Sequence, residues 1–395
     1  MRNEGVILIQ TALMILMLAA VSTLVIDSGV LWISRGQAQN AADAGALAGA
    51  LARAYDDFGD PPAAGGPAHA AATAVAERNV VWTETPGTVV TWACPAGMSS
   101  RCARVDVHRD GTSGSTTLPA FFGPLIGVTT QRIRATATAR VLTGNATNCM
   151  RPWAVADKWT HVVNPVPSYD RWSSMGGSPD EATPHDIYAP PDANGPGTGY
   201  TVSADAGLAL VLKRGNAHSD TEGISPGWFL AVALPDGAGG YMQGAAPYRS
   251  SIGACIGRPI GIGTLLPVQT GNMNGPTDQG FADLVAQDPS AVWNATDKLV
   301  HNSCAPACAP MSPRIVPIPV FDMDDYQYRR AANDWTGCPD GGRCVRVVNV
   351  LGFFADSIQG GDVTGYLMTH PGDFVPGVTA VSDDAGFLKS VHLVR

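Results

Sequence analysis

The stretch VILIQTALMILMLAAVSTLVI, residues 6–26, decides the architecture of this 395-residue chain. It contains no charged residue, and its polar members are all neutral: Gln10, Thr11, Ser22 and Thr23. At 1.5 Å per residue, a helix of this length spans about 30 Å, which is the hydrocarbon thickness of a bilayer. We therefore predict a membrane-spanning helix whose apolar residues face lipid: Val6, Leu8, Leu13, Leu16, Leu18, Val21, Leu24 and Ile26.

Two alternatives compete with a retained membrane anchor. A secretory signal peptide has a shorter apolar core, of about 7–15 residues, and a small-residue cleavage site in the following loop, which is absent here. A buried core helix would need apolar partners on all sides, but the chain beyond residue 56 is rich in Gly, Pro and Cys. No proline occurs between Asp27 and Tyr55, and AQNAADAGALAGALARAY is alanine-rich, so we predict one helix from about Val6 to Tyr55.

The bulk composition indicates a loop-rich protein without a nucleic-acid footprint. Charged residues make up 15% of the chain, and there are 45 Gly and 30 Pro. This charged fraction is well below the usual quarter, and a long all-helical body is not expected. The net charge is -9 and no stretch clusters Lys and Arg, so nucleic acid is not an expected partner.

The eight cysteines all follow the apolar run, and their even number predicts disulfides in an oxidising compartment. None of their spacings is the CxxC of a zinc ribbon, so we predict no metal site. The disulfides would place the body of the protein outside the cytoplasm. Other connectivities are possible, but proximity along the chain suggests Cys94 with Cys102, Cys304 with Cys308, and Cys338 with Cys344, which leaves Cys149 and Cys255 for each other.

The first 55 residues resemble a known family. A short charged N-terminus with Glu4 and Gly5 precedes the apolar span, an Asp-x-Gly turn follows at residues 27–29, and R-x-x-x-Q-N-A-A-D-A-G-A-L-A-G-A begins at Arg35. This order is similar to the N-terminal region of TadG-like and TadE-like proteins of the tight-adherence (Flp) pilus assembly system. The residues of the specific block are Gln39, Asn40, Ala41, Ala42, Asp43, Ala44, Ala46, Leu47, Ala48 and Gly49.

The resemblance implies a single-pass protein of a bacterial envelope, associated with pilus assembly or secretion, and it implies no catalytic residue. Longer TadG-like members carry a von Willebrand factor A domain with a D-x-S-x-S metal site. The nearest string here, residues 110–115, has a different spacing, so we expect a short form without that domain. Pilin-like precursors are cut after a glycine that lies upstream of a glutamate; here Glu4 precedes Gly5, so N-terminal processing is left open.

After the long helix, the pattern predicts an α+β fold. The sequence DDFGDPPAAGGP, residues 56–67, ends the helix because it combines prolines and glycines. A short alanine-rich helix is expected next, and then polarity alternates with the two-residue period of half-buried strands. We expect a pilin-like domain over residues 56–144, a helix lying on a small antiparallel sheet, with the helix at 69–79 and strands at 89–92, 103–108 and 131–141.

Residues 145–395 are expected to form a loop-rich, mostly β extracytoplasmic domain stapled by disulfides. The near-continuous apolar run at 345–354 is typical of a central strand. Two prolines in 314–321 predict an edge strand or an extended crossing. Further strands are expected at 208–212 and 228–234. A helix is expected at 277–287, with Thr277 as its N-cap.

The motifs that carry chemistry in other proteins are weak or missing here. Asp322, Asp324 and Asp325 could hold calcium or form a solvated turn, and they lack the spacing of an EF-hand. GxSxG, HExxH and a phosphate-binding loop are missing, and the run at 218–220 is no triad by itself. The eight histidines are isolated and are expected in loops or on the surface. Six tryptophans could line a sugar or peptide groove or pack in the core: Trp153, Trp159, Trp172, Trp228, Trp293 and Trp335.

We therefore expect a structural or assembly component of an Flp-type pilus or related secretion apparatus. It would cross the bacterial cytoplasmic membrane once, with its body in the periplasm or outside the cell. The expected partners are membrane lipid and other pilus or secretion components that pack on the helix, since its many small residues allow close approach. We expect no enzyme activity, no catalytic residue, no cofactor and no small-molecule substrate. The alternative is a membrane-tethered extracytoplasmic enzyme or carbohydrate-binding module.

Overall fold

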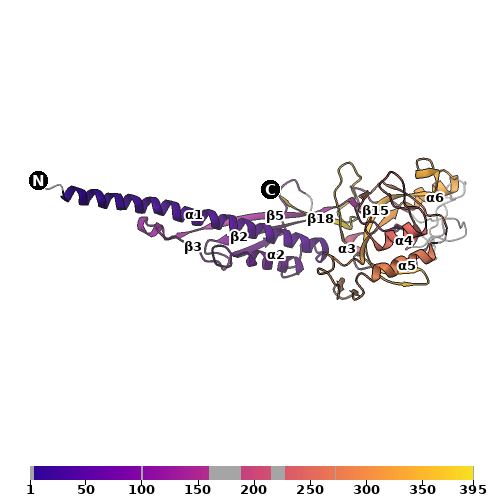
Figure 1. Ribbon diagram of the computed structural model, residues 1–395, viewed down its shortest axis with the longest axis horizontal. Coiled ribbons are helices and arrows are strands. Elements are labelled where there is room, and N and C mark those ends of the chain that lie inside the picture. The colour runs from indigo at the N-terminus through magenta and orange to yellow at the C-terminus, as the bar shows by residue number, and fades with distance from the viewer. Residues whose placement is uncertain (1–3, 99–100, 160–187, 215–226, 272, 395) are drawn as a thin grey trace, which may run out of the picture. The chain divides into compact units, whose positions relative to one another are not determined.

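The computed structural model describes residues 4–98, 101–159, 188–214, 227–271 and 273–394. The chain divides into two compact units. Unit 1 comprises Met1–Val141 and Val391–Arg395, and unit 2 comprises Leu142–Ser390. Figure 1 shows the elements of both units. The domain boundaries at 55 and 144 stay predictions.

One helix, α1 (Glu4–Tyr55), runs without interruption through the first part of unit 1, as the sequence predicts. It is the one helix among the described residues that is long and apolar enough to cross a membrane. Its most apolar window is not buried by the protein at all. A helical surface this apolar on all sides is stable in lipid rather than in water.

The second half of α1 packs against α2 (Pro67–Arg78) and the sheet of unit 1. Pro67 begins α2, where its missing N–H costs no helical hydrogen bond. The core between these elements is made mostly of small side chains, which let the backbones approach closely. The alanines that the two helices contribute to this core are Ala38, Ala41, Ala42, Ala46, Ala50, Ala54, Ala72 and Ala76.

The sheet of unit 1 is antiparallel where β1 (Gly87–Thr91), β2 (Cys102–Arg109) and β5 (Ile133–Thr143) pair. The strands form where the alternating pattern predicts them. β18 (Leu388–Val394) follows β5 in the strand order, and Val391 and Leu393 pack on the core of unit 1. The likeness of this arrangement to a pilin stays a prediction.

A hairpin of two short strands, β3 (Leu118–Pro119) and β4 (Thr130–Gln131), completes unit 1. Its loop contains the 3₁₀ turn η1 (Gly123–Ile126). The hairpin lies beside α1, on the side toward the N-terminus from the main sheet (Figure 1). This placement brings the apolar connection at residues 118–126 next to the long helix.

Unit 2 is built on a seven-stranded sheet that closes on itself. The strand order is β11-β15-β14-β7-β9-β8-β16, and β15 also pairs with β16, so six strands form a closed ring with β11 attached. A register shift between Ala355 and Ser357 lets the 16-residue β15 bend from one partner to the next. The strands are β7 (Trp153–Ala156), β8 (Ala209–Arg214), β9 (Trp228–Ala231), β11 (Leu265–Pro267), β14 (Ile315–Phe321), β15 (Cys344–Gln359) and β16 (Asp362–Met368).

The core of unit 2 contains large side chains. The ring centroid of Phe321 lies 6.3 Å from that of Trp228 and 5.6 Å from that of Tyr326, and all three side chains are buried. The central position predicted for 345–354 is confirmed, because β15 pairs on both sides. The mixed α+β class and the β-rich second part of the chain follow from these elements.

The prediction that 314–321 is an edge strand is wrong. β14 lies between β15 and β7 in the ring. Pro317 and Pro319 are two residues apart, so their nitrogens point to the same side of the strand. On that side the parallel pairing with β7 begins only at Val320, while the carbonyl oxygen of Pro317 accepts the backbone N–H of Arg151 at 2.8 Å. Because Pro317 and Pro319 precede the paired part of β14 on that side, their missing N–H groups remove no hydrogen bond between β14 and β7.

Shorter elements surround the ring. The helix predicted at 277–287 begins three residues earlier, so Thr277 is no N-cap: it is buried inside the helix and its Oγ1 donates to the Met273 carbonyl. The helices are α3 (Val202–Asp205), α4 (Ala245–Gly253), α5 (Asn274–Val285), α6 (Met323–Ala332) and the 3₁₀ turn η2 (Pro339–Gly341). The remaining strands are β6 (Ala146–Thr147), β10 (Ile260–Gly261), β12 (Val292–Asn294), β13 (Leu299–His301) and β17 (His370–Pro371).

The disulfides join the cysteine pairs that chain proximity suggests. One lies in unit 1 and three lie in unit 2, and no described cysteine is free. Each therefore links parts of the same unit. The pairs are Cys94 with Cys102, Cys149 with Cys255, Cys304 with Cys308, and Cys338 with Cys344.

Candidate functional site

The predicted anchor residues lie on all sides of the first half of α1. Leu8 is 73% exposed and Leu16 is 66% exposed, and the other described anchor side chains are also exposed. Leu24 lies in the same helix, but its side chain is outside the described part. Exposed apolar surfaces of this extent are typical of regions that contact lipid or apolar partners.

The block that carries the family resemblance has a different role, because four of its ten residues, all small, are buried within unit 1. Ala41, Ala42 and Ala46 are fully buried. A Cβ added at Gly45 would lie 2.8 Å from the Cβ of Ala76, and one added at Gly49 would lie 2.9 Å from that of Ala72. The small residues thus allow α1 to pack closely on α2 within the same chain. They are used in this contact and not in a contact with a helix of another protein.

Gln39 and Asp43 add polar contacts to the same block. The Gln39 side-chain amide donates to the Asp43 carboxylate at 2.8 Å and to the carbonyl oxygen of Thr136 at 3.3 Å. It thereby connects one turn of α1 to strand β5. Beyond the apolar span, the large hydrophobic side chains of α1 that remain exposed are those of Trp32, Ile33, Leu47 and Leu51.

Asp27, the first residue after the apolar span, ties a loop to α1. Its carboxylate accepts the backbone N–H of Phe121 at 2.9 Å, of Phe122 at 3.2 Å and of Gly123 at 2.6 Å. The side chain of Gln131 also donates to the Asp27 carbonyl. Asp27 is 6% exposed, so the loop covers the charge that directly follows the span. The turn expected at residues 27–29 is wrong, because these residues lie within α1. The sequence gave no signal of the loop that binds Asp27.

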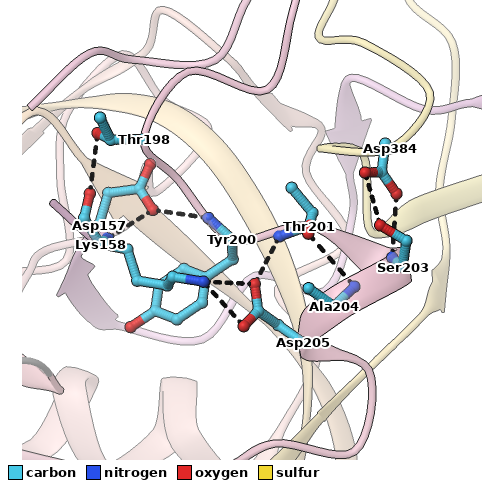
Figure 2. Close-up of polar contacts among 9 residues, drawn as sticks. All are labelled: Asp157, Lys158, Thr198, Tyr200, Thr201, Ser203, Ala204, Asp205 and Asp384. Carbon is cyan, nitrogen blue, oxygen red and sulfur yellow. Dashed lines mark hydrogen bonds and ion pairs between the residues drawn. The ribbon is translucent and has the colours of Figure 1, made fainter. Parts of the chain in front are cut away.

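In unit 2, Asp157 directly follows β7 and is a fully buried carboxyl (Figure 2). Its Oδ1 accepts the backbone N–H of Lys158 at 2.8 Å and of Tyr200 at 3.2 Å. Its Oδ2 has no hydrogen-bond partner among the described residues, and a Cβ at Gly199 would lie 2.5 Å from it. Burial raises the pKa of Asp157 to about 7, against the two N–H donors, which lower it.

Lys158 and Asp205 form an ion pair beside this carboxyl. The Lys158 Nζ lies 2.9 Å from both oxygens of Asp205 and 5.6 Å from the centre of the Tyr200 ring. Asp205 also accepts the backbone N–H of Thr201 at 2.8 Å. Burial raises the pKa of the Tyr200 phenol, with smaller contributions from both carboxylates.

The same cluster fixes the whole segment 198–205 (Figure 2). Thr198 donates to the Lys158 carbonyl at 3.1 Å. Thr201 caps α3 by accepting the backbone N–H of Ala204. Ser203 donates to Asp384 through its N–H at 3.0 Å and its hydroxyl at 2.7 Å. The contacts bind the segment to the end of β7 and to a distant loop of unit 2.

A carboxyl whose pKa lies near 7 is a candidate acid or base in an enzyme. The hydrogen-bond donors that the described residues supply to Asp157, however, are backbone N–H groups, so no acid–base partner from this part of the chain is aligned with it. Groups of three or more His, Cys, Asp or Glu that could hold a metal do not occur in the described part of the chain. The geometry is that of a polar hub that orders a loop.

The calcium candidates have other contacts. Asp322 is the N-cap of α6, where its carboxylate accepts the Asp325 N–H at 2.9 Å. Asp325 in turn accepts from the Arg329 side chain. Burial raises the pKa of Asp322. The three aspartates thus begin a helix, where acidic side chains are favourable.

The surface placement expected of all histidines is wrong for two of them. His108 is buried in β2 and His370 is buried in β17. β2 lies inside its sheet and β17 lies at the edge, and an isolated histidine in the sequence reveals burial at neither place. Burial lowers the pKa of His370 to about 4. The run at 218–220, with His218, lies outside the described residues.

The tryptophans fit core packing where they are described. Trp153 and Trp228 are buried in the ring of unit 2. Trp293 is stacked on Tyr366, with the ring centroids 4.6 Å apart. Trp172 lies outside the described residues. A sugar-binding groove therefore gains no support from the tryptophans described.

One comparison with known proteins bears on α1. Residues 5–53 match a family model. Its description is Putative Flp pilus-assembly TadE/G-like, and it confirms the resemblance seen in the block at 39–49. We call residues 5–53 the Tad segment; it lies within α1 and includes both the exposed apolar half and the packed small-residue half. Searches of curated proteins and of solved structures found no match.

Proposed function

We propose that this protein is a membrane-anchored, extracytoplasmic structural or assembly component of an Flp-type pilus or a related secretion apparatus. The observation that carries the proposal is the Tad segment, which coincides with one uninterrupted helix whose first half is apolar and exposed. The segment indicates an Flp pilus assembly component. The exposed half supports a single membrane crossing by that component.

The rest of the chain supports a role outside the cytoplasm. The four disulfides fit an oxidising compartment. In unit 1 the extension of α1 lies on an antiparallel sheet, which fits the proposed pilin-like arrangement. To unit 2, a closed ring of strands, we assign the surface that other pilus or secretion components would contact. The proposal assigns these parts to assembly and to no reaction.

Anchoring is tested by alkaline carbonate extraction of membranes from cells that make the full chain. The protein should stay in the membrane pellet. The substitution Leu16→Arg in the middle of the span should cost about 2.5–3.5 kcal/mol of insertion and release part of the protein. Leu51→Arg is the matched control, because Leu51 is 54% exposed on the same helix but lies beyond the span. Equal retention of both variants would contradict the anchor.

Partnership is tested by isolating the full chain from its host in mild detergent after chemical cross-linking. Recovery of other pilus or secretion components, lost in a chain that lacks residues 5–53, supports assembly. Recovery of none of them, from cells that make pili, would contradict it. A hydrolase substrate panel addresses the tethered-enzyme alternative: turnover that Asp157→Asn abolishes would favour that alternative.

A further inference from the structure

We infer that the loop at residues 120–129 is a second membrane contact, which lies on the bilayer surface beside the point where α1 leaves the membrane. The inference rests on the proposed anchor. Its occupant is lipid, rather than a second copy of the chain. The loop joins β3 to β4 and comes from a part of the sequence about a hundred residues away from the span.

The place of the loop along α1 is fixed by Asp27. Three successive backbone N–H groups, from Phe121, Phe122 and Gly123, donate to this one carboxylate. Asp27 directly follows the apolar span at 6–26. When that span fills the hydrocarbon core, Asp27 and the loop lie at its boundary. The tip of the hairpin lies beside α1 in Figure 1, in agreement with these contacts.

The chemistry of the loop suits lipid rather than water. No charged residue occurs between Asp110 and Arg132, a run that includes the whole hairpin. Phe121 is 55% exposed and Val128 is 45% exposed, so apolar side chains of the loop face outward. The backbone N–H of Phe121 donates to Asp27, the residue that directly follows exposed Ile26, so the loop lies next to the end of the apolar span. Aromatic side chains such as that of Phe121 are favourable at the membrane–water boundary.

The loop is also built to hold this position. A Cβ added at Gly123 would lie 2.4 Å from the Val128 carbonyl oxygen and 3.2 Å from the Asp27 carboxylate, so only glycine fits the turn. The three N–H donors satisfy the Asp27 carboxylate and shield it from the hydrocarbon. An unpaired carboxylate at this boundary would be costly. The contact thus combines an apolar outer surface with an internally satisfied charge.

Photolabelling of the wild-type full chain tests the inference. The protein is reconstituted in phosphatidylcholine liposomes that contain a phosphatidylcholine with a diazirine on its acyl chain, irradiated, and digested with trypsin. Cleavage after Arg and Lys yields three informative peptides: 3–35 contains the span, 110–132 contains the loop, and 347–389 contains exposed Phe374 of unit 2. Peptide 110–132 should carry several-fold more label than 347–389.

The three peptides separate the possible failures. Label in 3–35 without label in 110–132 would overturn the inference and leave the anchor intact. No label in 3–35 would instead contradict the proposed anchor, and this inference would fall with it. If 110–132 stays unlabelled and a bifunctional reagent joins it to the same peptide of another molecule, the loop is a contact between copies and the inference is overturned.

A double substitution identifies the side chains that make the contact. Phe121→Ser with Val128→Ser removes both exposed apolar groups but keeps the backbone N–H donors to Asp27. Label in 110–132 should fall several-fold, while label in 3–35 stays unchanged. Phe374→Ser, at 54% exposure in unit 2, is the matched control and should leave both peptides unchanged. Undiminished label in 110–132 of the double variant would contradict the assignment to these side chains.

Discussion

The cores of the two units are built from opposite kinds of side chain. Unit 1 packs α1 on α2 and a sheet through alanine and glycine, as at Ala46 and Gly45. Unit 2 fills a closed ring of strands with large aromatic and aliphatic groups, such as Phe321 and Trp228. A core of small side chains tolerates little added volume, whereas a core of large ones tolerates little loss. The same kind of substitution should therefore have different effects in the two units.

The largest effect is expected when a large side chain is removed from unit 2. Phe321→Ala leaves a cavity between Trp228 and Tyr326 and should lower the free energy of unfolding by about 3–5 kcal/mol. Phe374→Ala removes an exposed ring and should change it little. Hydrogen exchange of peptides from unit 2, followed in detergent, measures both variants. Equal exchange rates would show that the ring does not depend on its aromatic core.

A pH-dependent effect is expected from the polar hub of unit 2. The pKa of Asp157 is raised by burial from 3.8 to about 7, so the folded state keeps a proton that the unfolded state loses near pH 4. The free energy of unfolding therefore falls as pH rises from about 4 to 7 and stays lower above that range. This contribution should amount to about 2–3 kcal/mol between pH 5 and pH 8.

Asp157→Asn should remove that contribution, because an amide does not ionise and its oxygen can still accept from Lys158 and Tyr200. Guanidinium unfolding at pH 5 and pH 8, in detergent, gives the difference directly. Asp283→Asn, at an exposed carboxyl paired with Arg249, is the control and should leave the difference nearly unchanged. A variant at Asp157 with the wild-type pH dependence would assign the proton to another group.

An intermediate effect is expected when volume is added to unit 1. Gly45→Leu drives a side chain into Ala76, 2.8 Å from the new Cβ, and should cost about 1–3 kcal/mol. Gly36→Leu on the same helix has nothing within 4 Å of the new Cβ, and it should stabilise α1 by about 0.5–1 kcal/mol. Hydrogen exchange of peptides from unit 1 distinguishes them. Similar effects at both positions would contradict close packing of α1 on α2.

The smallest effect is expected when volume is removed from unit 1. Ala46→Gly should cost about 1 kcal/mol, mostly through the lower helix propensity of glycine, because only one methyl group is lost. Ala48→Gly, at a half-buried position of α1, has the same propensity cost and isolates the buried methyl. Unit 1 peptides again report the difference by hydrogen exchange. If Ala46→Gly lowered the free energy of unfolding as much as Phe321→Ala does, the proposed difference between the two cores would be contradicted.

Much of the fold was open to prediction because it depends on local patterns. A long apolar run without charge or proline predicts a continuous helix, and α1 forms over the expected residues. Alternation predicts the strands of unit 1, and proximity predicts the disulfide pairs. The position of β14 could not be predicted in this way, because the effect of Pro317 and Pro319 depends on which neighbouring strand their nitrogens face and where its pairing begins.

The candidate site also combines features that were visible in the sequence with contacts that only the folded chain forms. The block at 39–49 was visible in the sequence, but its burial against α2 depends on residues that arrive later in the chain, such as Ala72 and Ala76. The partner of Asp27 comes from residues 121–123, and the partner of Lys158 is Asp205. Contacts between side chains far apart in sequence leave no periodic signal in one chain.

By itself, the sequence determined the long apolar helix, its alanine-rich extension, the family of that segment and the three cysteine pairs that are close along the chain, because each follows from composition or spacing within a short stretch. Only the tertiary structure decided that the small residues of the extension are used inside unit 1, that a chargeless loop is bound to Asp27 at the end of the span, and that Asp157 is buried. Burial and long-range hydrogen bonds decided these features, and both exist only once distant parts of the chain meet.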